Sequence, residues 1–261
     1  MKSKNKFLII LSIIGPGLIT ANAGNDAGGI TTYSVVGAHY GYSMLWGMFA
    51  IAIGLAVVQE MNARMAVVTG KGLSDLIRER FGVKWAFFAM FILLIANLGV
   101  CIGDFAGIAA SLELFHISKY ISIPILTILI WFILTKGDYS KAEKVFLFLT
   151  ITFFGYIVTA FLVKPDWGHV ITSVVRPHAK FDKGYFLVLI GMVGTTITPY
   201  MQFYLQSSIV DKGISIKEYK YEKADVYIGT IWAILIALFI TVCTAESLFK
   251  AGINIDSAQD A

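Results

Sequence analysis

The chain has 261 residues, of which 57% are hydrophobic and 15% charged, and its mean hydropathy is +0.74. A soluble globular domain is closer to half apolar and a quarter charged, so this composition indicates an all-α polytopic membrane protein embedded in a lipid bilayer. The net charge of +4 is small. No basic patch with interleaved aromatic residues is present, which argues against a nucleic-acid partner. Two cysteines, both inside apolar runs, do not suggest a disulfide framework.

Seven apolar stretches approach or exceed the roughly 20 residues that a membrane-spanning helix needs. If the N-terminus is cytoplasmic, 15 of the 21 Lys and Arg residues fall in inside loops, so the positive-inside rule predicts that orientation. The lysine-rich start followed by an apolar run also looks like a signal peptide, but apolar spans continue after it, and we expect an uncleaved first helix. The predicted spans lie at about 7–38, 43–68, 85–112, 120–135, 143–163, 184–211 and 225–249.

The first span is interrupted in its middle, at 24–29, where the run 23–29 reads AGNDAGG. Asp26 places a carboxylate at membrane depth, which is costly, and the three glycines of this run argue against a regular helix there. The backbone groups that such a break frees must face protein or a water-filled cavity. An acid on a broken helix near the centre of the membrane is typical of a cation site in a transporter.

The sixth span is interrupted near Pro199, which removes a backbone donor and disfavours helix at Thr198. This break frees carbonyls near Thr195 and Ile197 and leaves the hydroxyls of Thr195 and Thr198 close by. Taken alone, the pattern fits a proline kink whose threonines bond back to their own helix. Because a second broken helix carries Asp26, we favour the interpretation that the break near Pro199 is part of a functional site.

The two interrupted spans each open a block of the sequence, a pattern typical of inverted-repeat transporters. The domain organisation predicted on this basis is a first five-helix repeat at 1–163, an extracellular linker at 164–183, and the first two helices of an incomplete second repeat at 184–261. We therefore expect the chain to be a fragment or truncated product, with partner helices supplied by the missing C-terminal part of a full-length protein.

Three helices resemble, in order, those of the NRAMP divalent metal transporters. Residues 15–20 (GPGLIT) leading to 26–29 (DAGG) resemble the first helix of that family, whose signature is Asp-Pro-Gly-Asn. Gln59 followed by 68–73 (VTGKGL) resembles the second helix, and 194–208 the sixth, where the usual text is Met-Pro-His. The resemblance implies a LeuT-like inverted-repeat fold with helices 1 and 6 broken, here ending after about seven transmembrane helices. It also implies metal transport across a bacterial-type plasma membrane.

The resemblance also implies the metal ligands and the transported ion. Asp26 keeps the ligand carboxylate, and the carbonyls of Ala23 and Thr195 take the positions of backbone ligands. The family's asparagine becomes Gly29 and its methionine becomes Thr198. A hydroxyl in place of sulfur leaves an all-oxygen site, which suits magnesium and manganese, and the lost amide makes room for the water that magnesium retains. This pattern is similar to the NRAMP-related magnesium transporters, so we expect Mg²⁺ and/or Mn²⁺ as the transported ion.

Proton coupling is expected to be weak or absent. Family members carry an acidic pair on the third helix, where this chain has Cys101 and Asp104, and the histidine of the sixth helix becomes Tyr200. Histidine titrates near neutral pH, whereas tyrosine titrates at about 10. Asp104 is either a functional acid or a structural acid bonded to a neighbouring helix. Asp104, Tyr200 and Gln59 are the candidates for proton handling or for supporting the ligands.

Two other functions fit parts of the pattern. One is an amino-acid or organic-solute symporter of the same fold, but the charge of Asp26 would repel a bound anionic group. The other is a truncated, transport-inactive membrane subunit. No nucleophile and base at catalytic spacing fall in the apolar spans, so neither an enzyme nor a cofactor is expected.

Overall fold

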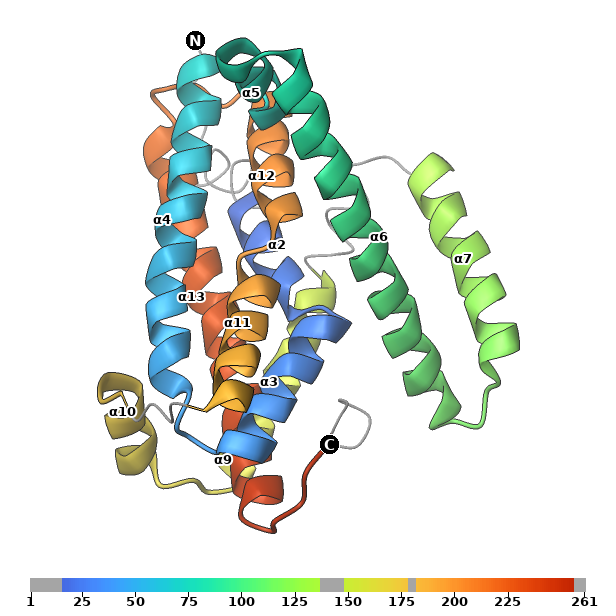
Figure 1. Ribbon diagram of the computed structural model, residues 1–261, viewed down its shortest axis with the longest axis vertical. Coiled ribbons are helices and arrows are strands. Elements are labelled where there is room, and N and C mark those ends of the chain that lie inside the picture. Colours follow the sequence, from blue (N-terminus) through green and yellow to red (C-terminus); the bar gives the residue numbers. More distant parts are fainter. Residues whose placement is uncertain (1–15, 137–147, 178–181, 256–261) are drawn as a thin grey trace, which may run out of the picture. The chain divides into compact units, whose positions relative to one another are not determined.

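The computed structural model describes residues 16–136, 148–177 and 182–255, and every regular element in these ranges is helical (Figure 1). The prediction of an all-α chain is therefore confirmed for the described residues. Parts of two predicted spans, 7–15 and 143–147, lie outside them, as do the predicted signal-like start and the polar residues 256–261. The longer helices and the two halves of the broken ones are α2 (Pro16–Asn22), α3 (Ala27–Tyr40), α4 (Leu45–Thr69), α6 (Val83–Glu113), α7 (Lys119–Lys136), α9 (Phe154–Leu162), α11 (Lys183–Thr196), α12 (Pro199–Asp211) and α13 (Tyr219–Thr244).

Four apolar helical segments of this part of the chain are long enough to cross a membrane: Leu45–Thr69, Val83–Glu113, Lys183–Asp211 and Tyr219–Phe249. The other predicted spans correspond to shorter apolar helices, Lys119–Ile133 and Ile151–Leu162, and to the broken first segment. Much of the apolar surface of α6 and α7 is exposed, with Phe87 and Ile128 as examples. An exposed apolar surface of this extent is suited to contact with lipid, as expected of an integral membrane protein.

Two short helices were not predicted. α5 (Leu73–Phe81) follows α4, and α10 (Trp167–Val175) lies within the stretch predicted as an extracellular linker. α10 begins where the carboxylate of Asp166 accepts hydrogen bonds from the backbone N–H groups of Gly168 and His169. An aspartate before an apolar run is a helix-start signal that the prediction did not use. Short turns complete the chain: η1 (Ala23–Asn25), η2 (Thr150–Phe153) and the π-helical η3 (Ala245–Phe249).

The chain separates into two compact units. Unit 1 comprises Met1–Gly24, Ala50–Asn97 and Thr196–Leu235, and unit 2 comprises Asn25–Phe49, Leu98–Thr195 and Ile236–Ala261. Two of the boundaries fall at the helix breaks, between Gly24 and Asn25 and between Thr195 and Thr196. Units defined by contacts differ from repeats defined by sequence order, so the division at 1–163, 164–183 and 184–261 stays a prediction.

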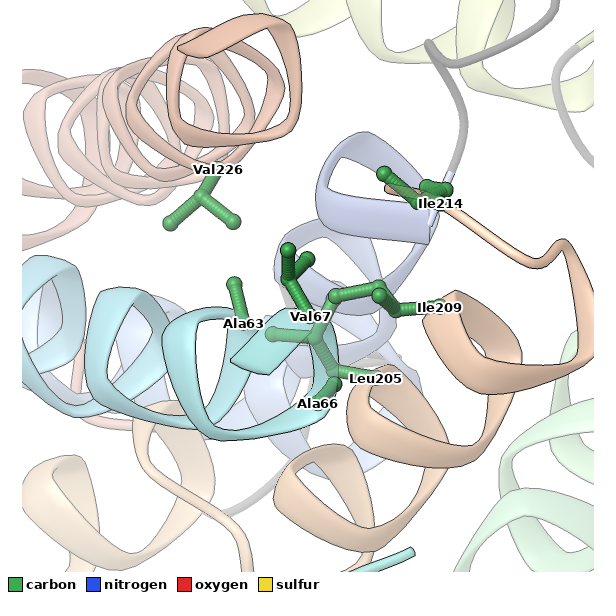
Figure 2. Close-up of a cluster of buried hydrophobic side chains, with 7 residues drawn as sticks. All are labelled: Ala63, Ala66, Val67, Leu205, Ile209, Ile214 and Val226. Carbon is green, nitrogen blue, oxygen red and sulfur yellow. The ribbon is translucent and has the colours of Figure 1, made fainter. Parts of the chain in front are cut away.

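Unit 1 has an apolar core between α4, α12 and α13 (Figure 2). Small residues on α4 allow the larger side chains of α12 to approach closely, and α2 also packs against α12. The end of α4 is tied to α12 by the amide of Gln206, whose Nε2 donates to the Lys71 carbonyl at 3.0 Å. The buried core residues are Ala63, Ala66, Val67, Leu205, Ile209, Ile214 and Val226.

Unit 2 depends on close packing between α3 and the end of α13. A Cβ atom on Gly37 would lie 2.0 Å from the Thr244 Oγ1 and 2.4 Å from the Thr241 carbonyl oxygen, so only glycine fits there. The Thr241 hydroxyl donates to the Tyr33 carbonyl at 3.2 Å. Small residues and interhelical threonine bonds are the usual means by which membrane helices approach one another.

Candidate functional site

The first helix is broken at a shorter stretch than the sequence predicted. α2 ends at Asn22, η1 covers Ala23–Asn25, and α3 starts at Ala27, so Gly28 and Gly29 are helical rather than part of the break. Asp26 lies between the two halves with extended backbone, φ −71° and ψ −176°, and its Oδ1 accepts a hydrogen bond from the Gly29 N–H at 2.7 Å. The glycines therefore do not interrupt the helix, because the side chain of Asp26 caps it.

Asp26 thus combines a capping role with a carboxylate, a group that has about four lone-pair sites and can accept further partners. The positive end of the α3 dipole stabilises its negative charge in surroundings where charge is otherwise costly. Gly29 contributes no side chain, and its backbone N–H holds the carboxylate in place. The structure therefore assigns Gly29 a positioning contact with Asp26, in the same unit of the chain.

Asp104 lies beside the same helix end. It is on α6, and its carboxylate accepts a hydrogen bond from the backbone N–H of Ala27 and interacts electrostatically with Asp26. One turn further along α6, a Cβ atom on Gly107 would lie 2.5 Å from the Ala27 Cβ, so α6 and the start of α3 are in direct contact. Two acids of unit 2, Asp26 and Asp104, therefore converge on the first turn of α3 and share its free N–H groups. The bond to Ala27 favours the structural interpretation of Asp104.

The sixth helix is broken where the sequence predicted. α11 ends at Thr196, Ile197 and Thr198 are non-helical, and Pro199 is the first residue of α12, a position that proline favours. Thr198 caps α12 with extended backbone, but its side chain makes no capping bond. The hydroxyl is buried without a hydrogen-bond partner among the described residues. Thr195 lies in the last turn of α11, in unit 2, and is half-buried.

Two predicted site residues of unit 1 are in contact. The Tyr200 hydroxyl, in the first turn of α12, donates a hydrogen bond to the Ala23 carbonyl at 3.0 Å. The oxygen predicted as a backbone ligand therefore already accepts one hydrogen bond. A carbonyl oxygen has two lone pairs, so this bond leaves one for a second partner.

Unit 1 also contains an amide cluster, which we define as Gln59, Asn62, Gln202 and Gln206. The Asn62 Nδ2 donates to the Gln202 Oε1 at 2.9 Å, which joins α4 to α12. Gln59 is fully buried, and neither of its side-chain polar atoms has a partner in the described part of the chain. Asn62 and Gln202 were not predicted, although Thr198, Gln202 and Gln206 recur every four residues along one face of α12.

The eight predicted residues divide between the two units. Among the described residues, no group of three or more His, Cys, Asp and Glu side chains is arranged to hold a metal ion. The donors among the eight predicted residues are the carboxylates of Asp26 and Asp104, hydroxyls, the Gln59 amide and backbone carbonyls, which are ligands for hard cations. Unit 1 contains Ala23, Thr198, Tyr200 and Gln59, whereas unit 2 contains Asp26, Gly29, Thr195 and Asp104.

Solved structures share this fold. The crystal structure of the Eremococcus coleocola manganese transporter in complex with an aromatic bis-isothiourea substituted compound superposes with a TM-score of 0.81 at 20% identity, covering 94% of this chain and 53% of that one. A histidine-to-alanine mutant of the same protein gives a TM-score of 0.77 at 19% identity, with the same coverage. At this level of identity the likeness establishes the fold, an all-helical transporter architecture matched over about half its length.

Sequence comparison identifies the family. The divalent metal cation transporter MntH of Staphylococcus aureus is 28% identical over 229 residues, 85% of this chain and 50% of that protein. The MntH of Caldanaerobacter subterraneus subsp. tengcongensis is 24% identical over 276 residues, 100% of this chain and 65% of that protein. This chain therefore spans about half to two thirds of the length of the curated relatives it matches. The family model described as natural resistance-associated macrophage protein-like matches residues 17–261, so the chain belongs to the Nramp family of transporters and is not an enzyme.

Proposed function

We propose that this chain forms part of a transporter that moves divalent metal cations, Mg²⁺ and/or Mn²⁺, across the membrane by alternating access about its two helix breaks. The observation that carries the proposal is Asp26, a carboxylate on a break in an apolar segment, whose Oδ1 accepts a hydrogen bond from the Gly29 N–H. A bound cation offsets the free-energy cost of burying the Asp26 carboxylate, because opposite charges attract strongly where little water is present. Relatives named as divalent metal cation transporters support the same substrate class.

The remaining ligands that we propose are the Ala23 and Thr195 carbonyls and the Thr198 hydroxyl. All are oxygen donors, and the Thr198 hydroxyl makes no other hydrogen bond in the described part of the chain. Oxygen donors favour magnesium and manganese over softer metals, and Gly29 leaves space for a metal-bound water. A solved structure of the same fold is named as a manganese transporter, which supports manganese as one substrate.

We further propose that transport is weakly coupled or uncoupled to protons. Tyr200 stands where relatives have a histidine and is engaged with the Ala23 carbonyl, and Asp104 is engaged with the Ala27 N–H. Histidine titrates near neutral pH, whereas tyrosine titrates at about 10, so the replacement removes a natural proton carrier. We propose that the protein lies in a bacterial-type plasma membrane and that its N-terminus is cytoplasmic.

The test is uptake into proteoliposomes and binding calorimetry with Mg²⁺, Mn²⁺ and Ca²⁺ in competition, with Asp26→Ala as the control. We expect Mg²⁺ and Mn²⁺ to compete with each other, metal binding by Asp26→Ala to be about 100-fold weaker, and the vesicle interior not to acidify. Uptake of iron or cadmium that magnesium does not inhibit would contradict the choice of metal. Metal binding without uptake would favour the transport-inactive subunit, and uptake of an amino acid instead of a metal would favour the symporter.

A further inference from the structure

Two acidic side chains are buried at the start of α13. Glu222 is 0% exposed and Asp225 is 2% exposed, and their spacing of three residues places them on the same face of the helix. Aspartate and glutamate are almost never fully buried unless they are paired. Neither residue belongs to the proposed metal site, so their burial requires a separate explanation.

Asp225 has a clear structural role. Its Oδ2 accepts a hydrogen bond from the Gly17 N–H at 2.7 Å, at the beginning of α2. A Cβ atom on Gly17 would lie 2.7 Å from the Val226 backbone nitrogen and 2.9 Å from the Asp225 carbonyl carbon. The start of α2 therefore lies directly on the backbone of α13, and the carboxylate of Asp225 holds it there.

Glu222 has no comparable hydrogen bond. Both of its carboxyl oxygens are buried without a hydrogen-bond partner among the described residues. The charged groups that act on it are Asp225 on the same helix and Lys212 at the end of α12. Asp225 disfavours a second negative charge, and Lys212 makes no hydrogen bond to either Glu222 oxygen. An ionised carboxylate in these surroundings has lost its water without gaining donors in exchange, which is costly.

We propose that Glu222 is a proton-binding site that holds its proton while α2 is packed against α13, and that loss of this proton loosens that contact. The ionised form can recover its hydration only if water reaches it, and the segment that is held one turn from Glu222 is α2, through the bond from Gly17 to Asp225. Ionisation also places two negative charges on adjacent turns of one helix. The ligand is a proton, and the site is independent of the metal that the protein transports.

The sign of the pH dependence follows from linkage. If the folded chain holds a proton that the unfolded chain releases, stability is highest at low pH and is lost as the pH rises. We expect the melting temperature of the detergent-solubilised chain to fall by about 2–4 °C between about pH 6 and pH 9. Glu222→Gln keeps the shape without the ionisation, and should be insensitive to pH over this range. Asp211→Asn, which replaces an exposed acid at the end of α12, should keep the wild-type profile.

Hydrogen exchange reports whether α2 is the element that loosens. At high pH, amides in residues 17–22 should exchange faster in the wild type than in Glu222→Gln, whereas at low pH the two should agree. Comparing two proteins at one pH removes the intrinsic effect of pH on exchange. Equal exchange in the two proteins at high pH would overturn the proposed link to α2.

Two further results would overturn the proton site itself. One is a Glu222→Gln variant whose melting temperature keeps the wild-type pH profile. A variant that is less stable than the wild type at every pH would have the same meaning, because Glu222 would then be ionised and held by a cation or by Lys212. The other is a drop in melting temperature on addition of a chelator that occurs in the wild type but not in Glu222→Gln, which would indicate a metal bound at Glu222 rather than at Asp26. Should Glu222→Gln fail to fold, infrared spectra of the wild type decide, because a protonated carboxylic acid has a band that disappears on ionisation. Absence of that band at pH 6 would contradict the proposal.

Discussion

The two helices that follow the breaks begin in different chemical ways. α3, in unit 2, starts at two carboxylates, Asp26 and Asp104, and both accept hydrogen bonds from its first turn. α12, in unit 1, starts at Thr198 and Pro199, without a side-chain cap and without a charge. Its buried polar neighbours are the neutral members of the amide cluster.

The difference shows where a charge is tolerated inside an apolar chain. At α3 the backbone supplies N–H donors to each carboxylate, so part of the hydration that an anion loses is replaced. At α12 the proline removes one donor, and buried amide and hydroxyl atoms already lack partners among the described residues. Negative charge is therefore suited to the start of α3 and poorly suited to the amide cluster. This contrast can be tested by exchanging charged and neutral groups.

Removal of the charge at Asp26 should have the largest effect. Asp26→Asn keeps a good capping residue but loses the carboxylate, so metal affinity should fall by about 100-fold while the melting temperature stays close to the wild type. Asp26→Ala should lose the same affinity and about 1 kcal/mol of stability in addition, because the cap is lost. Calorimetric titration and thermal unfolding measure the two quantities separately. If Asp26→Asn binds the metal as tightly as the wild type, the negative charge of the Asp26 carboxylate is not required for metal binding.

Introduction of a charge into the amide cluster should be the next largest effect. Gln202→Glu places a buried carboxylate where the Asn62 Nδ2 donates the hydrogen bond that Gln202 now accepts, so we expect a loss of about 2 kcal/mol at neutral pH. The loss should shrink as the pH falls and the new carboxyl becomes neutral. Gln202→Met, which is similar in length and uncharged, serves as the control and should cost less than half as much. Equal losses for the two variants would mean that the hydrogen bonds of the Gln202 amide, rather than the absence of charge, govern this cluster.

The contact between α6 and α3 gives a third test. Gly107→Ala would force its Cβ against the Ala27 Cβ, so α6 must shift and weaken the bond from Ala27 to Asp104, at a cost of about 1–2 kcal/mol. Gly103→Ala is on the same helix, and outside its own stretch of helix no described atom lies within 4 Å of the new Cβ, so this change should be neutral or slightly stabilising. Chemical unfolding in detergent compares the two. A stable Gly107→Ala would show that Asp104 does not depend on this close approach.

The features that the sequence predicted well are those set by a single residue. Pro199 determines the break before α12 by its own covalent structure, and the break was predicted where it is found. Asp26 was correctly placed between two helix halves, but the break was predicted too long, because Gly28 and Gly29 were interpreted as helix breakers. The capping bond of Asp26 stabilises the helix over them, a local interaction that outweighs the low helix propensity of glycine.

Features that depend on packing could not be predicted in the same way. Glu222 lies in a stretch of charged and aromatic residues, YKYEKAD, that reads as a solvated helix start, yet it is fully buried. The pairing of Asn62 with Gln202 joins helices that are distant in the sequence. The four-residue spacing along α12 identifies a polar face but not its partner. Family membership was predicted from motifs and is confirmed, whereas the magnesium assignment and the individual ligands remain proposals.

The smallest effect is expected at the bond between Tyr200 and Ala23. Tyr200→Phe removes a hydroxyl that donates to the Ala23 carbonyl, so stability should fall by about 0.5–1 kcal/mol. If this carbonyl is a ligand, the released lone pair should leave metal affinity unchanged or raise it by up to about fivefold, because the ion no longer competes with a donor. Transport between pH 6 and pH 8 should keep the same pH profile, since tyrosine does not titrate in that range. A profile that changes in Tyr200→Phe would mean that this hydroxyl takes part in proton movement, and the contrast between a charged α3 and a neutral α12 would then no longer hold.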